Sequence, residues 1–129
     1  MIHLVTGGSG SGKSAYAEQC ILDFGGTRRV YIATMQPFGA EGQARIARHR
    51  KMRAAKKFST IECYTNLKEV ELEPGSDVLL ECMSNLTANE IFDPSGAGKA
   101  RTEEEILAGV SRLAHQARNL VLVTNEIFS

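Results

Sequence analysis

Short apolar runs alternate with helical patterns in the first part of the chain. Residues 2–5 form an apolar run that meets glycines at once, as a strand entering a loop does. Apolar side chains in residues 17–24 then recur at helical spacing, and the glycine pair at 25–26 ends that helix. A second β-rich run, residues 30–34, ends in turn-prone residues. The pattern predicts a strand, a helix and a second strand.

The alternation continues through the middle of the chain. Residues 41–57 contain no proline, and no glycine after Gly42, so their composition favours a helix with a thin apolar stripe. Further strands are predicted at 59–64 and 78–80, and a short helix at 84–92. The middle segment therefore adds two strands and two helices.

The last part of the chain adds a loop, a helix and an apolar strand. Residues 93–99 have the composition of a loop, and Thr102 with Glu105 three residues later predicts a capping box that begins a helix. We expect Asn119 to close this helix and residues 120–124 to form a strand buried on both faces of a parallel sheet. Strands alternating with helices predict an α/β fold, in which ligands bind at the carboxyl ends of the strands.

The segment between the first strand and the first helix matches the pattern G-x-x-x-x-G-K-[ST]. It comprises Gly7, Gly8, Ser9, Gly10, Ser11, Gly12, Lys13 and Ser14. Backbone N–H groups and the helix N-terminus cradle phosphates in such a loop, Lys13 reaches the β- and γ-phosphates, and the Ser14 hydroxyl coordinates Mg²⁺. A glycine-rich turn without a ligand is the alternative, but both the pattern and its setting match phosphate binding. The sequence predicts a three-layer P-loop NTPase-type domain with a mainly parallel sheet.

A metal-orienting acid is expected at the end of another apolar strand. Glu81 follows one apolar run, and Glu126 lies just beyond another. Each is equally compatible with a solvated carboxylate at a strand end. The sequence leaves both as candidates for holding Mg²⁺ together with Ser14.

A dense run of cations occupies residues 45–57, and no acid interrupts it. Such a run is often a solvated face or a nucleic-acid patch. His49, however, lies four residues after Arg45 and four before Arg53, so a helix places all three side chains near one face. Neighbouring positive charge favours a neutral imidazole, the form that attacks phosphorus, while the arginines hold phosphate oxygens. His49 is therefore a candidate nucleophile.

Five motifs in order make the chain resemble the bifunctional adenosylcobinamide kinase and adenosylcobinamide-phosphate guanylyltransferase family of cobalamin biosynthesis. They are Leu4-Val5-Thr6-Gly7-Gly8 with Gly12-Lys13-Ser14, then Tyr31-Ile32-Ala33-Thr34, Arg45-Ile46-x-x-His49 with Arg53, Leu79-Leu80-Glu81-Cys82, and Val121-Leu122-Val123-Thr124-Asn125-Glu126. The resemblance covers nearly the whole chain. It implies two reactions, phosphorylation of adenosylcobinamide and transfer of GMP from GTP to the product, with GTP and ATP as substrates.

The resemblance also implies roles for individual residues. His49 is the residue that GTP guanylylates. Lys13, identified by the phosphate-loop pattern, is the second candidate catalytic residue. The nucleotide contacts that the resemblance implies, beyond the phosphate loop, are Ala33, Thr34, Met35, Arg50, Lys51, Met52, Arg53, Glu62 and Glu81.

Composition narrows the partners and the compartment. Fifteen Lys and Arg residues balance fifteen Asp and Glu residues, so no global field recruits nucleic acid or an anionic membrane. Three widely spaced cysteines disfavour a zinc knuckle or a disulfide framework and fit a reducing compartment. No stretch approaches the ~18 apolar residues that span a bilayer. We expect a cytoplasmic protein with no nucleic-acid partner and no membrane span.

The resembled proteins continue beyond the position matching Ser129 through a further loop, helix and strand. We therefore expect a single domain over residues 1–129 that is C-terminally short relative to the family. Such a sheet would expose an edge or an apolar face, which either a homo-oligomer covers or a rearranged domain hides. Two alternatives to the bifunctional enzyme stay open, a nucleotide-binding module without turnover and a different small-molecule kinase of the P-loop class.

Overall fold

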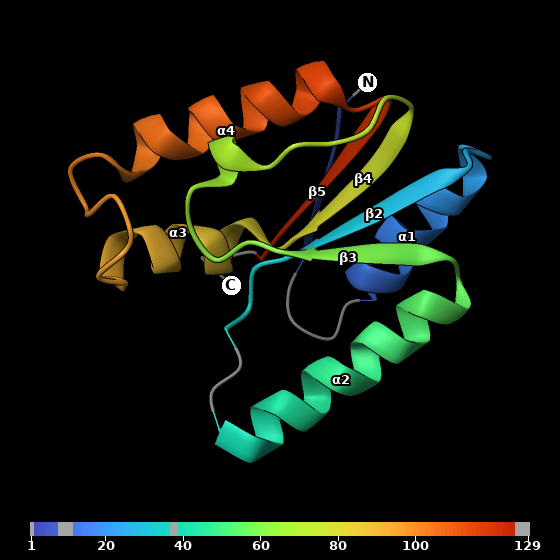
Figure 1. The fold of residues 1–129 in the computed structure, drawn as a ribbon, viewed down its shortest axis with the longest axis horizontal. Coiled ribbons are helices and arrows are strands. Elements are labelled where there is room, and N and C mark those ends of the chain that lie inside the picture. The colour runs from blue at the N-terminus through green and yellow to red at the C-terminus, as the bar shows by residue number, and fades with distance from the viewer. Residues whose placement is uncertain (1, 8–11, 37–38, 126–129) are drawn as a thin grey trace.

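The computed structural model describes residues 2–7, 12–36 and 39–125 (Figure 1). The strands are β1 (Ile2–Gly7), β2 (Arg28–Ala33), β3 (Phe58–Glu62), β4 (Ser76–Glu81) and β5 (Asn119–Asn125). The helices are α1 (Lys13–Asp23), α2 (Gly39–Ala55), α3 (Met83–Phe92) and α4 (Thr102–Gln116), with a short 3₁₀ helix, η1 (Leu67–Glu69).

All five strands belong to one sheet in the order β1-β5-β4-β2-β3, and every pair is parallel. The predicted α/β fold with a mainly parallel sheet is thereby confirmed. Because parallel strands share their direction, the carboxyl ends of β1, β2, β4 and β5 meet at one edge of the sheet. Gly7, the first residue of the phosphate-binding motif, ends β1 at this edge.

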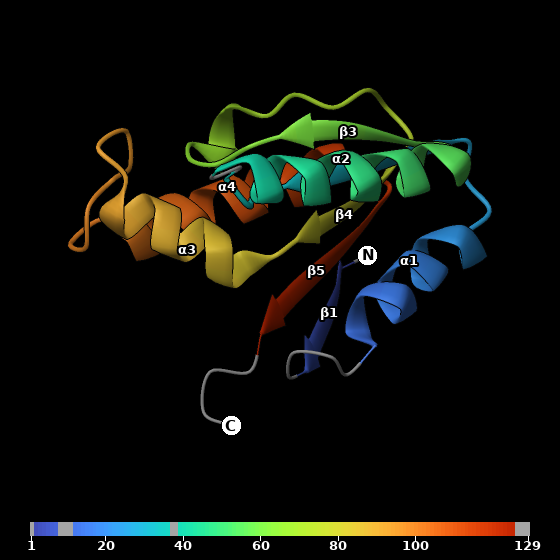
Figure 2. The ribbon, with the colours of Figure 1, turned by 90° about the horizontal axis from the view of Figure 1, so that it is seen from below.

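Helices cover both faces of the sheet, which makes three layers. Val78 and Leu80 of β4 pack in the core beneath α3 and α4, whereas Leu79 packs in the core beneath α1. All three are fully buried. Figures 1 and 2 show α1 and α2 on one side of the sheet and α3 and α4 on the other. Burial on both faces explains why β4 and β5 read as continuous apolar runs rather than alternating ones.

β1 lies at an edge of the sheet and is covered unevenly. Val5 is buried in the core beneath α1, while Ile2 and Leu4 are 53% and 63% exposed. Their register with Leu120 and Leu122 of β5 places Ile2 and Leu4 on the face that α3 and α4 cover elsewhere. In the described part of the chain, β1 thus presents an exposed apolar face.

The start of α4 differs from the predicted capping box. Arg101 is the N-cap residue, and Thr102 is the first residue of the helix. The Thr102 hydroxyl donates to the Gly98 carbonyl (2.7 Å), and the Glu105 carboxylate pairs with Lys68 (2.8 Å). The prediction was wrong because the Thr102 hydroxyl is taken by the Gly98 carbonyl, while the Glu105 carboxylate pairs with the side chains of Lys68 and Arg101 (3.2 Å). Asn119 likewise begins β5 instead of closing α4, which ends at Gln116.

α2 stands apart from the other helices in its burial. Arg53 is the one buried residue of this helix, which matches its thin apolar stripe. The Lys56 and Lys57 N–H groups donate to the Arg53 and Ala54 carbonyls, and Lys57 takes a left-handed conformation (φ 64°) that ends the helix. Within the described residues, no helix has the length and apolar character needed to cross a membrane.

Candidate active site

A cavity of about 180 Å³ opens at the carboxyl edge of the sheet. It lies between the start of α1, the ends of β2 and β4, the first turn of α3 and one face of α2. Its described lining consists of Lys13, Tyr31, Ala33, Thr34, Met35, Ile46, His49, Arg53, Glu81, Cys82 and Asn85. Residues from five segments of the sequence therefore meet at one hollow.

Lys13 is the described phosphate-loop residue that lines this cavity. Gly7 ends β1, and Gly12 has a φ of 80° immediately before α1 begins at Lys13. A left-handed conformation of this kind favours glycine, because a side chain would be strained there. Lys13 thus lines the cavity from the positive end of a helix dipole. Gly8, Ser9, Gly10 and Ser11 lie outside the described residues.

Glu81 is held between two hydroxyl groups. The Ser14 hydroxyl donates to Glu81 Oε1, and the Tyr31 hydroxyl donates to Glu81 Oε2 (3.2 Å). Burial, reinforced by the Glu81 charge, raises the pKa of Tyr31 far above its ordinary value, so the phenol stays protonated and keeps donating. The structure therefore joins the two residues predicted to hold a metal, one from α1 and one from β4.

The oxygen atoms at this point suit a hard cation such as Mg²⁺. A hydroxyl and a carboxylate are ligands that Mg²⁺ accepts, and it takes its remaining ligands from phosphates and water. Within the described residues, no group of three His, Cys, Asp or Glu side chains gathers to hold a metal by itself. The pair Ser14 and Glu81 therefore fits a metal that arrives with a phosphate ligand. Glu126, the other candidate acid, lies outside the described residues.

Arg53 is a buried cation at the floor of the cavity. Its side chain belongs to a residue only 6% exposed, and its guanidinium carbon lies 3.6 Å from the centroid of the Tyr31 ring. Among the described residues, Arg53 Nε has no hydrogen-bond partner. Burial of a cationic donor without a partner costs free energy, which an anion in the cavity would offset. The arrangement favours a phosphate ligand.

His49 lies one helical turn before Arg53 and lines the same cavity. Both project from α2 toward Lys13 and Glu81, which come from α1 and β4. Arg45, expected on the same face, instead lines a neighbouring pocket that shares Met35 and Asn85 with the cavity. α2 thus places His49 and Arg53 in the lining of the cavity and Arg45 in the lining of the neighbouring pocket.

Ala33 ends β2, Thr34 and Met35 follow it, and all three line the cavity. Thr34 is fully buried, and its hydroxyl accepts from Cys82 N–H (2.8 Å) and donates to the Cys82 carbonyl (2.9 Å). These bonds join the ends of β2 and β4. Thr34 therefore shapes the wall, and its hydroxyl is already engaged within the protein.

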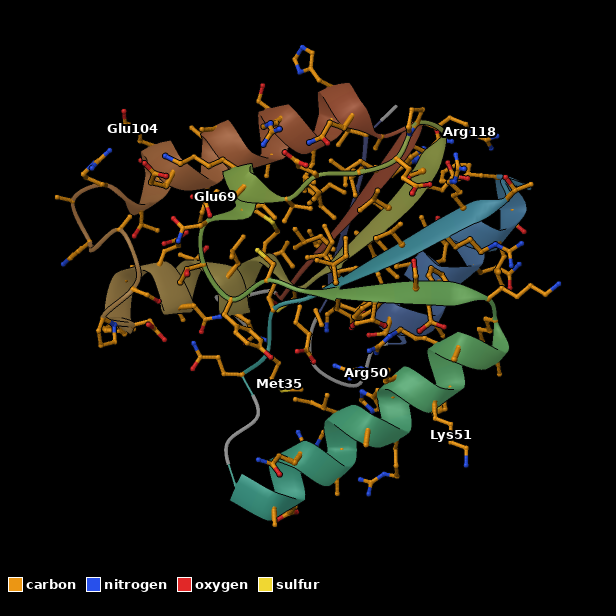
Figure 3. The ribbon with its side chains drawn as sticks, viewed as in Figure 1. Met35, Arg50, Lys51, Glu69, Glu104 and Arg118 are labelled. Carbon is orange, nitrogen blue, oxygen red and sulfur yellow. The ribbon has the colours of Figure 1, made fainter. Side chains whose placement is uncertain are left out.

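The other predicted contact residues lie outside the cavity lining. Arg50 forms an ion pair with Glu62 across the surface of β3, and both side chains are 40–50% exposed. Lys51 is exposed and lies on the opposite side of α2 from Arg50 (Figure 3). Met52 is 63% exposed. The structure thus gathers Lys13, His49, Arg53 and Glu81 and leaves these four residues beside the site.

Tyr31 and Asn85 are cavity residues that sequence reasoning missed. Tyr31 lies two residues before Ala33 in β2, so the alternation of a strand places both on the same face. Asn85 lies in the first turn of α3, directly after the end of β4. Both residues lie at or just after the carboxyl end of a strand, where ligands bind in parallel sheets. Their positions relative to the predicted strands could therefore have identified them.

Comparison with known proteins gives a consistent match. The model of the family described as cobinamide kinase / cobinamide phosphate guanyltransferase (CobU) matches residues 3–129. The chain is 35% identical over 140 residues to the bifunctional adenosylcobalamin biosynthesis proteins CobU of Escherichia coli (strain K12) and Salmonella typhimurium (strain LT2). Each alignment covers 98% of this chain and 76% of the relative.

A third relative carries a different name. The chain is 33% identical over 131 residues to the bifunctional adenosylcobalamin biosynthesis protein CobP of Pseudomonas aeruginosa (strain PAO1), with 98% of this chain and 72% of that protein covered. The family match spans the phosphate-loop segment, α2 and the ends of β2 and β4, which are the elements that build the cavity. The chain therefore belongs to the cobinamide kinase / cobinamide phosphate guanyltransferase family.

Proposed function

We propose that this chain catalyses two successive transfers on one site. In the first, a nucleoside triphosphate, ATP or GTP, phosphorylates the hydroxyl of the aminopropanol arm of adenosylcobinamide. In the second, GMP passes from GTP to the adenosylcobinamide phosphate through a guanylyl intermediate on His49. Membership of the family and the composition of the cavity support this proposal.

One observation carries the proposal. A potential nucleophile, His49, lines the same cavity as the phosphate-loop lysine, Lys13, and as Arg53, a buried cation whose Nε has no hydrogen-bond partner in the described part of the chain. A kinase of the P-loop class needs the lysine but has no use for a histidine one turn from a buried arginine. Covalent transfer through histidine uses all three, because the cations hold the phosphate chain while the imidazole attacks it.

Phosphoryl transfer relies on positioning and charge. The arm hydroxyl attacks the γ-phosphorus, the bond from that phosphorus to the β,γ-bridging oxygen breaks to release the nucleoside diphosphate, and the hydroxyl proton passes to solvent. Lys13 and the N-terminus of α1 stabilise charge on the phosphate oxygens. Mg²⁺ held by the Ser14 hydroxyl and the Glu81 carboxylate would supply further neutralisation of that charge when bound.

Guanylyl transfer splits one displacement into two. An imidazole nitrogen of His49 attacks the α-phosphorus of GTP, an N–P bond forms, and pyrophosphate leaves as the bond to the α,β-bridging oxygen breaks. A phosphate oxygen of adenosylcobinamide phosphate then attacks the same phosphorus, and the N–P bond breaks to return a neutral histidine. Arg53, stacked on Tyr31, would bind the oxygens of the attacked phosphate.

The remaining nucleotide contacts are proposed by their place around the cavity. Ala33 and Met35 lie at its wall and would contact the nucleotide beyond its phosphates. Arg50, Lys51, Met52 and Glu62 lie beside the cavity, so they would contact only a part of the nucleotide that extends past α2 toward β3.

Labelling of the wild-type protein tests the proposed function. Incubation with Mg²⁺ and GTP radiolabelled at the α-phosphate should yield a covalent adduct that is labile in acid and stable in alkali, as a phosphoramidate is. GTP labelled at the γ-phosphate is the matched control and should leave no label. Addition of adenosylcobinamide phosphate should discharge the adduct. Tight GTP binding with neither adduct nor turnover would contradict the proposal and identify a nucleotide-binding module.

Replacement of Tyr31 by phenylalanine should lower the rate of both transfers by about tenfold. The phenyl ring still stacks beneath Arg53, but Glu81 loses a hydrogen bond to a charged acceptor, worth roughly 1.5–3 kcal/mol in proteins. Because Tyr31 acts by positioning Glu81, the concentration of Mg²⁺ needed for half-maximal rate should rise while the KM for GTP changes little. Steady-state rates over a Mg²⁺ titration measure this, and an unchanged titration would rule out the positioning role.

A further inference from the structure

A second pocket adjoins the active-site cavity. Its volume is about 390 Å³, and it shares Met35 and Asn85 with the cavity. It lies between the segment after β2, the first turns of α2 and the half-buried face of α3 that carries Asn85 and Asn89. Arg45, in its lining, precedes His49 by four residues, which is roughly 6 Å along a helix. A molecule in this pocket would therefore lie within reach of a group bound at His49 or at the phosphate loop.

Side-chain amides dominate the polar lining of this pocket. Gln36, Asn85 and Asn89 contribute carboxamides, and Met35 contributes an apolar, adaptable thioether. A carboxamide both donates and accepts hydrogen bonds, so it is the natural partner of another carboxamide. The lining is thus suited to a neutral ligand rich in amides and is poorly suited to a second phosphate chain.

Two of these amides are oriented before any ligand binds. Asn89 Nδ2 donates to the Thr34 carbonyl (2.7 Å), and Gln36 Nε2 donates to Asp93 Oδ2 (2.7 Å). Hydrogen bonds from Ser95, together with the one from Gln36, lower the pKa of Asp93, so the acceptor of the Gln36 bond stays ionised. Both bonds use amide N–H groups, which leaves the Gln36 and Asn89 carbonyl oxygens to accept from a ligand.

The charge and the volume of this pocket limit the ligands that it can hold. Glu41 and Arg45 place one negative and one positive side chain at the wall that α2 provides, so the pocket has no excess of either sign from them. Its volume lies near the lower end of the range for small-molecule pockets, roughly 300–1,000 Å³. The pocket can therefore hold one side chain and part of the edge of a large ligand, while most of that ligand stays outside.

We infer that this pocket binds the acceptor, adenosylcobinamide. Its side chains would form hydrogen bonds with the carboxamides at the edge of the corrin ring, next to the arm that is phosphorylated. The inference rests on the proposed function for the identity of the acceptor. A corrin periphery carries primary carboxamides, which match the amides of Gln36, Asn85 and Asn89. The hydroxyl at the end of the neighbouring arm then passes Met35 and Asn85 into the cavity where the nucleotide phosphates are bound.

Binding of dicyanocobinamide, measured by equilibrium dialysis with its visible absorbance, tests this inference. The Gln36→Ala variant should bind dicyanocobinamide about tenfold more weakly than the wild type, the cost of one hydrogen bond to an oriented amide. The Asn89→Ala variant should also bind it more weakly, because it removes the second oriented carboxamide. Gln43→Ala is the matched control, because Gln43 is an exposed glutamine of α2 outside the pocket lining, and its affinity for dicyanocobinamide should equal that of the wild type.

GTP affinity, measured on the same proteins, separates the acceptor pocket from the nucleotide site. The loss of dicyanocobinamide affinity in Gln36→Ala should exceed any loss of GTP affinity by about tenfold. Unchanged dicyanocobinamide binding in both pocket variants, equal losses for the two ligands, or no binding to the wild type would overturn the inference. A wild type that binds dicyanocobinamide through Gln36 but forms no guanylyl adduct would support the pocket and contradict the proposed function.

Discussion

The His49→Ala variant is expected to lose the covalent guanylyl label completely. Alanine has no nucleophilic nitrogen, so no N–P bond can form with the α-phosphorus. The rate of GMP transfer to adenosylcobinamide phosphate should fall by about three orders of magnitude or more, because transfer without the covalent intermediate has to proceed by a single direct displacement. Scintillation counting of acid-labile label after incubation with α-labelled GTP measures the loss of the label.

Phosphorylation of adenosylcobinamide by His49→Ala should survive, since Lys13, Ser14 and Glu81 remain in place at the other wall of the cavity. His115→Ala is the matched control, because His115 is an exposed histidine of α4 whose Nδ1 lies 2.7 Å from the Ser111 carbonyl of its own helix. Label that persists in His49→Ala would assign the nucleophile to another residue. Loss of both activities would indicate that His49 is needed for nucleotide binding.

Replacement of Lys13 by methionine should lower the rates of both transfers by about three orders of magnitude. Removal of one preorganised group that stabilises charge in a transition state typically costs 10²- to 10³-fold or slightly more. Methionine keeps much of the length and the apolar stem of lysine and removes only the ammonium group. Because Lys13 contributes to one cavity that serves both reactions, the two rates should fall together.

Parallel rate measurements with GTP and adenosylcobinamide or its phosphate check this expectation. Lys99→Met, in the exposed loop before α4, is the control for the loss of a positive charge and should behave as the wild type. A selective loss of phosphoryl transfer, with guanylyl transfer retained, would show that the two reactions do not share the phosphate loop.

The sequence alone supported those parts of the site that are local. Three short-range patterns carried this information: the eight-residue phosphate loop, its setting between a strand and a helix, and the i, i+4 spacing of His49 and Arg53. The regular geometry of helices and strands converts such patterns directly into positions of side chains. The same reasoning led to the order of strands and helices and to the parallel sheet, which the structure confirms.

Two predictions from short sequence patterns differ from the structure, one at the start of α4 and one for Arg45. Thr102 and Glu105 have the spacing of a capping box, but Lys68 on η1 attracts the glutamate. Arg45 shares a helical face with His49, yet that face is long enough to border two separate pockets. Ion pairs with distant residues and the borders of pockets are set by the tertiary structure, and periodicity carries no information about either of them.

The sequence by itself therefore determined that a phosphate loop, a basic helix with His49 and several strand ends exist. Only the tertiary structure decided which of them meet. Ser14 and Glu81 are brought together across 67 positions, and Arg53 stacks on Tyr31 from another element. The strand order β1-β5-β4-β2-β3 produces these meetings. That order depends on how whole faces of helices and sheet bury their apolar surface together, which no short window of sequence encodes.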